Sequence, residues 1–176
     1  MSIYLRSIFI NLFLTSLFLA GCQIKKPSHL EYVRSVDKLT NMLMALDEKV
    51  DTFEARDLAK ESIGYAQKLA KEYNLVSPPY VQNMLVNAGL KKRGLCYEWA
   101  DDLFTYLTAR DYRTLVLHRV GANIGKLREH NALSVSYKGE GIAHSILLDA
   151  WRNSGNLFFI KIEEDKKYSW KERFYK

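Results

Sequence analysis

The sequence predicts an α+β fold in which helices come first and an antiparallel sheet follows. Between about residues 30 and 110, apolar side chains recur every three or four positions, which is the period of an amphipathic helix. From 113 to 165 the pattern changes to short strand-like runs separated by turn residues. The chain has 176 residues, and 30–176 suits a single domain with one sizeable core.

The first two predicted helices each carry one apolar stripe. The first begins at Leu30, and Asp51 or Thr52 caps the second. We expect both stripes to form a core between helices. A partner-binding coiled coil is the alternative, but the repeat is short for one. The stripe residues are Val36, Leu39, Leu43, Leu46 and Val50 in the first helix, and Leu58, Ala59, Ile63, Ala66, Leu69, Ala70 and Tyr73 in the second.

Two further helices are predicted. Ser77-Pro78-Pro79 breaks the second helix and can start a third, because proline is tolerated in a first turn. Gly89 suits the end of this helix. The fourth helix begins near Cys96 and runs to about Ala109. The expected buried face of the third helix consists of Val81, Met84, Leu85 and Ala88.

Four strands are expected after the helices, at 114–120, 130–137, 144–151 and 156–162. The second and third flank Lys138-Gly139-Glu140-Gly141, a turn sequence, and therefore predict an antiparallel hairpin. We expect the sheet to pack on the helix that begins near Cys96.

The N-terminus has the layout of a secretory signal, with Arg6, an apolar run at 8–20 and small residues before Cys22. The run of roughly 13 residues is short for a membrane span of ~20. Leu19-Ala20-Gly21-Cys22 resembles the lipobox of bacterial lipoproteins.

The lipobox resemblance implies cleavage after residue 21, acylation of Cys22, and a lipidated tether at 22–29 that holds the protein to the membrane. Gln23, where an Asp favours inner-membrane retention, makes the outer membrane the expected location, with the domain facing the periplasm. The alternative is an uncleaved anchor in which the cysteine occurs by chance.

Composition argues against several other classes. The net charge is +6, but the basic residues are scattered and no nucleic-acid-binding motif is present, so no nucleic-acid partner is expected. The His and Cys residues lack metal-ligand spacing, and Asp101-Asp102 alone is a weak calcium pattern. No glycine-rich phosphate loop occurs, and no metal or cofactor is expected.

Cys96 is the first candidate for chemistry, because Cys22 is assigned to lipid and leaves it without a disulfide partner. A predicted helix N-terminus and the nearby cations of 91–93 both favour the thiolate, the reactive form. The alternative is a buried structural thiol.

His130 and Asp149 are the expected partners of this thiol. With the hairpin turn centred near residue 140, Asp149 lies across from residue 131, give or take one, and thus beside His130. Neighbouring cross-strand side chains lie within roughly 5 to 8 Å, close enough for an imidazole–carboxylate bond. His144 has the opposite parity to Asp149 and belongs at the far end of the hairpin. His118 and His29 have no such pairing.

Four other side chains have alternative roles. Trp99 and Trp151 either form part of the core or wall the site and exclude water. Asn83 and Asn87 could donate to an oxyanion, although helix-surface or capping roles are commoner for such residues. The backbone N–H of Cys96 is the preferred donor.

These residues resemble the bacterial transglutaminase-like superfamily of papain-like cysteine enzymes over about 78–165. The resemblance implies that Cys96 is the nucleophile, His130 the base and Asp149 the residue that orients it, with acyl transfer through a thioester. Two positions depart from the usual pattern: Asn131 follows the histidine, and Leu90 stands where papain-type enzymes carry an oxyanion glutamine. The motifs concerned are Gly94-x-Cys96-x-x-Trp99-Ala100, His130-Asn131-Ala132 and Leu148-Asp149-Ala150-Trp151.

The expected function is that of a lipid-anchored cysteine peptidase or amidase, hydrolytic rather than crosslinking, with a protein or peptide substrate. A peptidoglycan peptidase of the NlpC/P60 type is less well matched, because those enzymes usually place a second histidine where Asp149 stands. A third hypothesis is an inactive transglutaminase-like domain that binds or assembles envelope proteins. A sulfur within reach of the imidazole favours catalysis, and a sulfur buried away from any cleft favours the binding role.

Overall fold

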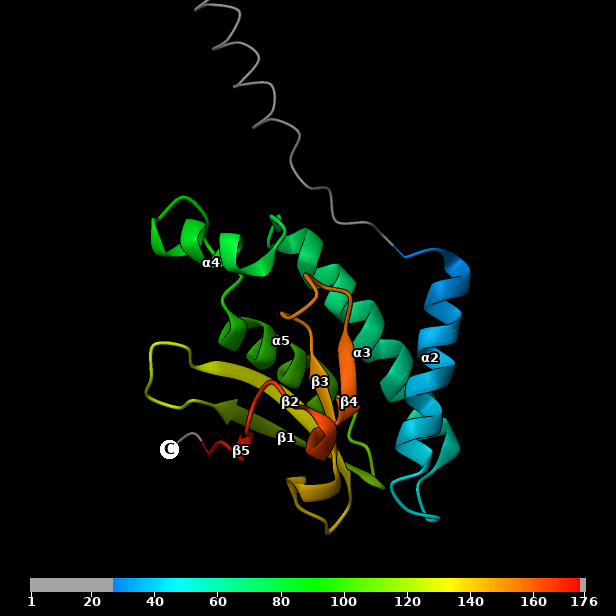
Figure 1. Cartoon of the computed structure of the whole chain (residues 1–176). Helices are drawn as coiled ribbons and strands as arrows, with labels where there is room; N and C mark the ends of the chain where they lie inside the picture. Colours follow the sequence, from blue (N-terminus) through cyan, green and yellow to red (C-terminus); the bar gives the residue numbers. More distant parts are fainter. Residues whose placement is uncertain (1–26, 175–176) are drawn as a thin grey trace, which may run out of the picture.

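The computed structural model describes residues 27–174, and this part of the chain has four helices followed by a five-stranded antiparallel sheet (Figure 1). The predicted α+β class is confirmed. The predicted signal sequence and Cys22 lie outside the described residues. The helices are α2 (His29–Met44), α3 (Thr52–Glu72), α4 (Pro79–Asn87) and α5 (Cys96–Thr108). The strands are β1 (Leu115–Ala122), β2 (His130–Tyr137), β3 (Ile146–Asp149), β4 (Phe158–Lys161) and β5 (Lys171–Glu172).

Local sequence explains where the first two helices begin. Ser28 caps α2 in a capping box with Glu31, so the helix begins at His29, which belongs to α2 and not to the tether. The side chain of Asp51 accepts hydrogen bonds from the first turn of α3. Both predicted stripes face inward, and nearly all their residues are buried, which confirms core packing between helices. Within 27–174, no helix has both the length and the apolar character needed to span a bilayer.

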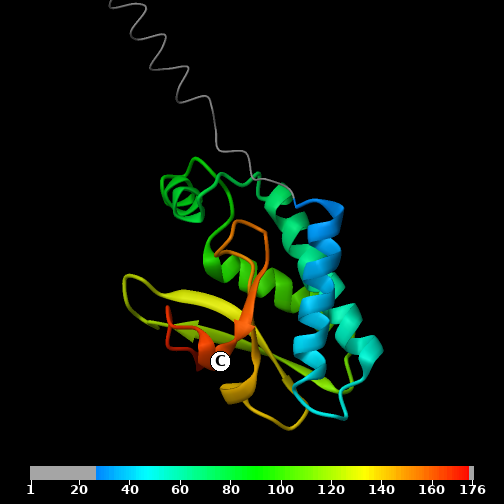
Figure 2. The same cartoon turned by 45° about the vertical axis from the view of Figure 1, so that its right-hand side comes forward.

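The helix α5 lies between the sheet and α3, and α2 packs on the outside of α3 (Figure 2). Leu103 and Leu107 of α5 are buried against β2 and β3 residues such as Leu133 and Leu148. A smaller apolar cluster lies on the opposite face of the sheet. Trp170, which follows β4 in the sequence, packs against this cluster. The sheet therefore has one face on the helices and the other under residues that follow β4. The small cluster consists of Val120, Ala132, Leu147 and Ile162.

The predicted buried face of α4 is wrong. Met84 is 68% exposed, and the buried residue of this helix is Gln82, a polar side chain. A polar residue can be buried here because its amide makes three hydrogen bonds to backbone atoms. The helix α4 therefore contributes little to the apolar core.

The strand order is β4-β3-β2-β1-β5, and all neighbours are antiparallel. The hairpin of β2 and β3 forms as predicted, with Leu133 opposite Leu148 and Ser134 opposite Leu147. The third strand is shorter than predicted, because a 3₁₀ turn at Ile142–His144 precedes it. The strand β5 was not predicted.

Candidate active site

Cys96 is the first residue of α5, and the backbone before it is held by the side chain of Glu98. Glu98 Oε2 accepts hydrogen bonds from the N–H groups of Gly94 and Leu95, at 2.7 and 2.9 Å. These bonds satisfy donors just before the helix and fix the direction in which it starts. Cys96 is half-buried and is a free thiol.

Gly94 explains part of the Gly-x-Cys pattern. Its φ is +128°, and an added Cβ would lie 2.6 Å from Cγ of Gln82. Any other residue would therefore combine backbone strain with a steric clash. The Gly94 carbonyl accepts a hydrogen bond from Trp99 Nε1 at 3.1 Å. Trp99 is fully buried in the main core, so of its two predicted roles the structure supports the core one.

His130 and Asp149 come together as the hairpin register predicts. His130 Nε2 lies 2.7 Å from Asp149 Oδ2, and both side chains are almost completely buried. Continuation of the β2–β3 register puts Asp149 across from Ala132, one residue further than the predicted centre. His130 is then the diagonal neighbour on the same face. Because Nε2 is engaged by the carboxylate, Nδ1 is the ring nitrogen left for the thiol.

Arg152 fixes the same carboxylate through both of its oxygens. Its backbone N–H donates to Asp149 Oδ1 at 3.0 Å, and its Nε donates to Oδ2 at 2.9 Å. The same guanidinium donates to both oxygens of Asp165, at 3.2 and 2.7 Å. Arg152 thus joins the carboxylate beside His130 to the segment after β4. Arg152 was not among the residues predicted from the sequence, although it lies only three residues after Asp149.

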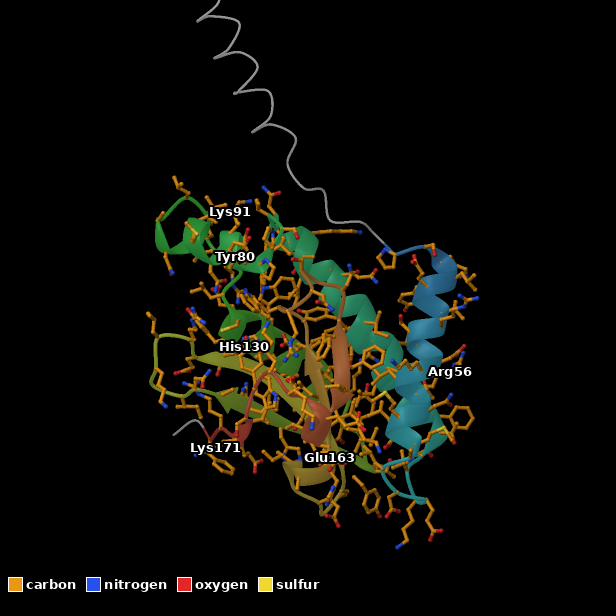
Figure 3. The ribbon with its side chains drawn as sticks, viewed as in Figure 1. Arg56, Tyr80, Lys91, His130, Glu163 and Lys171 are labelled. Atoms are coloured by element: carbon orange, nitrogen blue, oxygen red, sulfur yellow. The ribbon has the colours of Figure 1, made fainter. Side chains whose placement is uncertain are left out.

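Three aromatic rings surround the imidazole of His130. The centroids of Tyr168, Trp151 and Trp170 lie 4.7, 4.9 and 5.5 Å from that of His130. Trp151 therefore forms a wall of the site, which is one of the two roles predicted for it. Its Nε1 donates a hydrogen bond to Asn83 Oδ1 at 3.0 Å. In the view of Figure 3, His130 lies between α4 above and Lys171 of β5 below.

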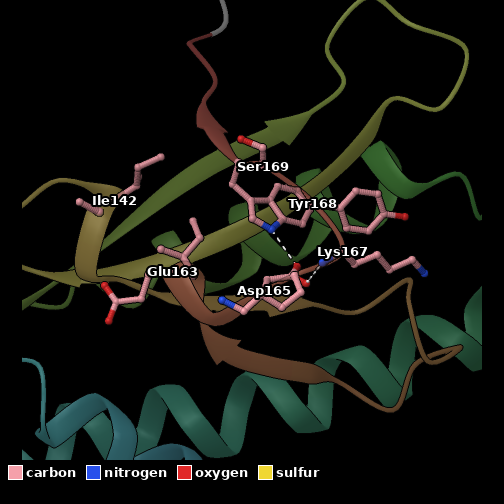
Figure 4. A pocket seen from close by; sticks show the side chains of 10 residues that line it. Ile142, Glu163, Asp165, Lys167, Tyr168 and Ser169 are labelled. Carbon is pink, nitrogen blue, oxygen red and sulfur yellow. Dashed lines mark hydrogen bonds between the residues drawn. The ribbon is translucent and has the colours of Figure 1, made fainter.

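The segment that carries Tyr168 and Trp170 is itself anchored. Asp165 accepts hydrogen bonds from Trp170 Nε1 at 2.9 Å and from the Lys167 backbone at 3.0 Å (Figure 4). A cavity of about 490 Å³ lies along this segment and is lined by residues 162–163 and 165–170 together with Ile142 and Ala143. Cys96 is not part of its lining. The cavity adjoins the aromatic cover of His130 and does not open onto the sulfur.

The electrostatics of the pair favour separated charges. Burial raises the pKa of the Cys96 thiol, but hydrogen bonding to His130, its charge, and donation by Asn131 outweigh burial and hold the pKa below its ordinary value. Burial lowers the pKa of His130, and hydrogen bonds to Asp149 and Cys96 overcome this and raise it to about 9. The pKa of Asp149 is lowered: burial opposes ionisation, but the hydrogen bond and charge of His130 and the charge of Arg152 prevail.

The other histidines are engaged elsewhere. His118 lies 2.7 Å from Glu172 Oε1 and 2.8 Å from Ser136 Oγ. His144 is exposed and contacts Glu163 at 2.8 Å. Since neither contacts Cys96, they leave His130 as the imidazole of the site. His29 is in α2.

Lys91, Lys92 and Arg93 were expected to stabilise the thiolate of Cys96 by their positive charge, but the structure pairs Arg93 and Lys91 with other groups. The guanidinium of Arg93 pairs with Glu98 at 3.3 Å and with Asp102 at 2.8 Å. The ammonium of Lys91 donates to the Asn74 carbonyl. Arg93 is therefore engaged by carboxylates of α5, and Lys91 by a carbonyl of the turn that follows α3.

Asn131 contacts the thiol. In the sequence this residue stands out only because it departs from the usual transglutaminase-like pattern, and no role was predicted for it. Its Nδ2 lies 3.9 Å from Cys96 Sγ, and the Glu129 carbonyl oxygen lies 3.8 Å from the same sulfur. Consecutive side chains leave a strand on opposite faces. His130 and Asn131 both reach the sulfur because it lies at the end of β2.

No group of three or more His, Cys, Asp or Glu side chains within residues 27–174 is arranged to hold a metal ion. No protein-family model, curated protein or solved structure matches the chain. The chemical interpretation of the site therefore rests on its own geometry.

Proposed function

We propose that the protein is a lipid-anchored cysteine hydrolase of the cell envelope, with a papain-like, transglutaminase-like domain that cleaves an amide or peptide bond. The observation that carries this proposal is the buried His130–Asp149 bond of 2.7 Å beside a thiol whose pKa His130 lowers. A histidine oriented by a carboxylate and in reach of a thiol at a helix start is the arrangement that nucleophilic catalysis requires.

Each residue then has a defined step. The Cys96 sulfur attacks the carbonyl carbon, forming a C–S bond while the carbonyl π pair moves to oxygen. His130 gives its proton to the leaving nitrogen as the C–N bond breaks, and a thioester remains. Water then attacks the thioester, and His130 takes one of its protons. The C–S bond breaks to return the thiolate and release a carboxylic acid, which gives its remaining proton to solvent. Asp149 stays ionised throughout and holds the imidazole in place.

The anchor is the second part of the proposal. Cys22 carries the lipid, 22–28 form the tether up to the start of α2 at His29, and the domain faces the periplasm from the outer membrane. A Cys22→Ser variant, expressed in a Gram-negative host, should keep its signal sequence and lose the mass of the acyl groups. Identical processing of the variant and the parent chain would refute the lipid anchor.

The catalytic part is tested on the full chain with p-nitrophenyl acetate, an activated ester that acylates thiolates. We expect acetylation of Cys96, located by peptide mass spectrometry, followed by hydrolysis of the thioester. His130→Ala should slow acylation by about 10²-fold or more, whereas His144→Ala, a matched change at an exposed histidine, should have no effect. Equal acylation in both variants would contradict the proposal and favour a binding module.

A further inference from the structure

The residues that precede Cys96 supply no side-chain donor to its sulfur at the two positions that could be expected to do so. Leu90 stands at one of them and is 74% exposed. The neighbouring Gln82 cannot take over this role, because its Oε1 accepts from Val76 N–H and its Nε2 donates to the Arg93 and Tyr73 carbonyls. Neither Leu90 nor Gln82 therefore donates to the sulfur.

Asn131 provides such a donor, from the sheet instead of from the helices. Its side chain is buried, at 5% exposure for the residue, and its Nδ2 lies 3.9 Å from Cys96 Sγ. The same Nδ2 donates to Glu129 Oε1 at 3.4 Å, while Oδ1 accepts from Arg173 Nη1 at 2.6 Å. Every polar atom of this carboxamide therefore has a partner.

These partners determine which way the carboxamide faces. A guanidinium has only donors, so the group next to Arg173 must be the oxygen of Asn131. A carboxylate has only acceptors, so the group next to Glu129 must be the NH₂. The second N–H of that NH₂ is then left for the sulfur. In the reverse orientation, two N–H groups would oppose each other at Arg173 and two oxygens would oppose each other at Glu129.

The strand β5 brings the guanidinium to this place. Its pairing with β1 continues past Glu172, because the Arg173 N–H donates to the Arg119 carbonyl at 2.8 Å. Arg173 also forms an ion pair with Glu129. A short edge strand thus supplies the group that holds Asn131 from the side away from the sulfur.

We propose that Asn131 is a further catalytic residue, whose side-chain N–H stabilises the thiolate of Cys96, and that Arg173 is the positioning residue that aims this N–H at the sulfur. The inference rests on the proposed function, since it concerns the same nucleophile. It assigns to β5 a role in the site, because the pairing of this strand with β1 places the next residue, Arg173, where it orients the donor.

The test is the pH dependence of iodoacetamide labelling of Cys96 in the full chain, measured by peptide mass spectrometry. We expect Asn131→Ala to slow labelling at about pH 6.5 by about 3- to 10-fold, as for loss of one hydrogen bond, and to shift the midpoint of the profile upward. Asn41→Ala, the same change at an exposed residue of α2, should leave the profile unchanged.

Arg173→Met separates positioning from general stabilisation. It should slow labelling in the parent chain but have no further effect in an Asn131→Ala background, because Arg173 acts through Asn131. If its effect persists in that background, the charge of Glu129 is responsible and the positioning role is overturned. Arg173→Lys, which keeps a donor, should restore part of the rate. If Asn131→Ala does not fold, an unchanged profile in Arg173→Met overturns the proposal.

The outcomes distinguish this inference from the proposed function. A profile that His130→Ala changes and Asn131→Ala does not would remove Asn131 from the mechanism and leave the Cys96–His130 pair intact. An ordinary thiol profile in the parent chain, unaffected by either change, would refute the proposed function itself.

Discussion

Replacement of Asp149 by Asn separates the charge of this side chain from its shape. The amide oxygen can still accept from the Arg152 backbone N–H, which now reaches Oδ1 at 3.0 Å. Arg152 also keeps its two bonds to Asp165. What disappears is the negative charge at Oδ2, which lies 2.7 Å from His130 Nε2, together with the acceptor that this oxygen offers to Arg152 Nε. We therefore expect the variant to fold and its imidazole to titrate differently.

The size of the change follows from the opposing effects on His130. Its pKa is raised from 6.5 to about 9 against the effect of burial. Without the carboxylate, only the hydrogen bond to Cys96 and its charge oppose burial, and the pKa should return to about 6.5. At about pH 7.5, the ratio of imidazolium to neutral imidazole is then about 30 in the parent chain and about 0.1 in Asp149→Asn. The ratio therefore falls by about 300-fold.

The assay is an NMR titration of the imidazole of His130, together with the pH profile of Cys96 labelling. The labelling rate at about pH 6.5 should fall at least about tenfold, because the thiolate loses its cationic partner. The matched control is Glu163→Gln, which changes a carboxylate 2.8 Å from the exposed His144 and should leave the site unaffected. A His130 midpoint that stays near its parent value in Asp149→Asn would refute the electrostatic reasoning.

Three further predictions concern stability and are measured by urea unfolding. Gly94→Ala should cost about 2 kcal/mol more than Gly139→Ala, since both glycines have positive φ but only Gly94 has an atom within 3 Å of an added Cβ; equal losses would contradict the clash with Gln82. Leu133→Ala, at a fully buried position, should cost about 2–5 kcal/mol, and Leu127→Ala, at a fully exposed one, less than about 0.5 kcal/mol; similar costs would contradict the assigned core. Glu54 accepts three hydrogen bonds from Arg113 and Thr114, and its pKa is lowered by them although burial opposes this. The ionised Glu54 carboxylate contributes to the free energy of unfolding above its unfolded pKa of about 4.3, and this contribution is lost as pH falls. Glu54→Gln should therefore cost about 1–2 kcal/mol at neutral pH and progressively less in acid. A cost that does not depend on pH would refute this.

The parts of the fold that follow from local periodicity could be predicted. The stripes of α2 and α3 and the β2–β3 turn each depend on residues close in sequence. Because a turn fixes the register of its hairpin, the contact between His130 and Asp149 could also be derived from the sequence alone. Parity then excluded His144, which the structure places with Glu163.

The features that were missed depend on partners distant in sequence. The composition of α4 suggested an apolar buried face. A polar side chain can be buried instead when neighbouring segments supply its hydrogen-bond partners, and backbone atoms of 73, 76 and 93 do so for Gln82. Arg93 was expected to favour the thiolate, but it pairs with carboxylates of α5. The contact of Asn131 with Arg173 spans 42 residues, and no periodicity indicates which edge a two-residue strand will join.

The position of β2 has a consequence for the order in which the site comes apart. This strand is hydrogen-bonded to β1 along its whole length and to β3 at its centre. Its amides should exchange with solvent only when the sheet opens as a unit. The N–H groups of Glu98 and Trp99 donate to the Leu95 carbonyl, but those of Cys96 and Tyr97, at the very start of α5, have no partner within the helix and should exchange early. Under mild denaturant the sulfur should therefore move before the imidazole does. Loss of thiol reactivity would then precede loss of the fold. His130 and Asp149 would keep their positions, so that the site forms again when the start of α5 refolds.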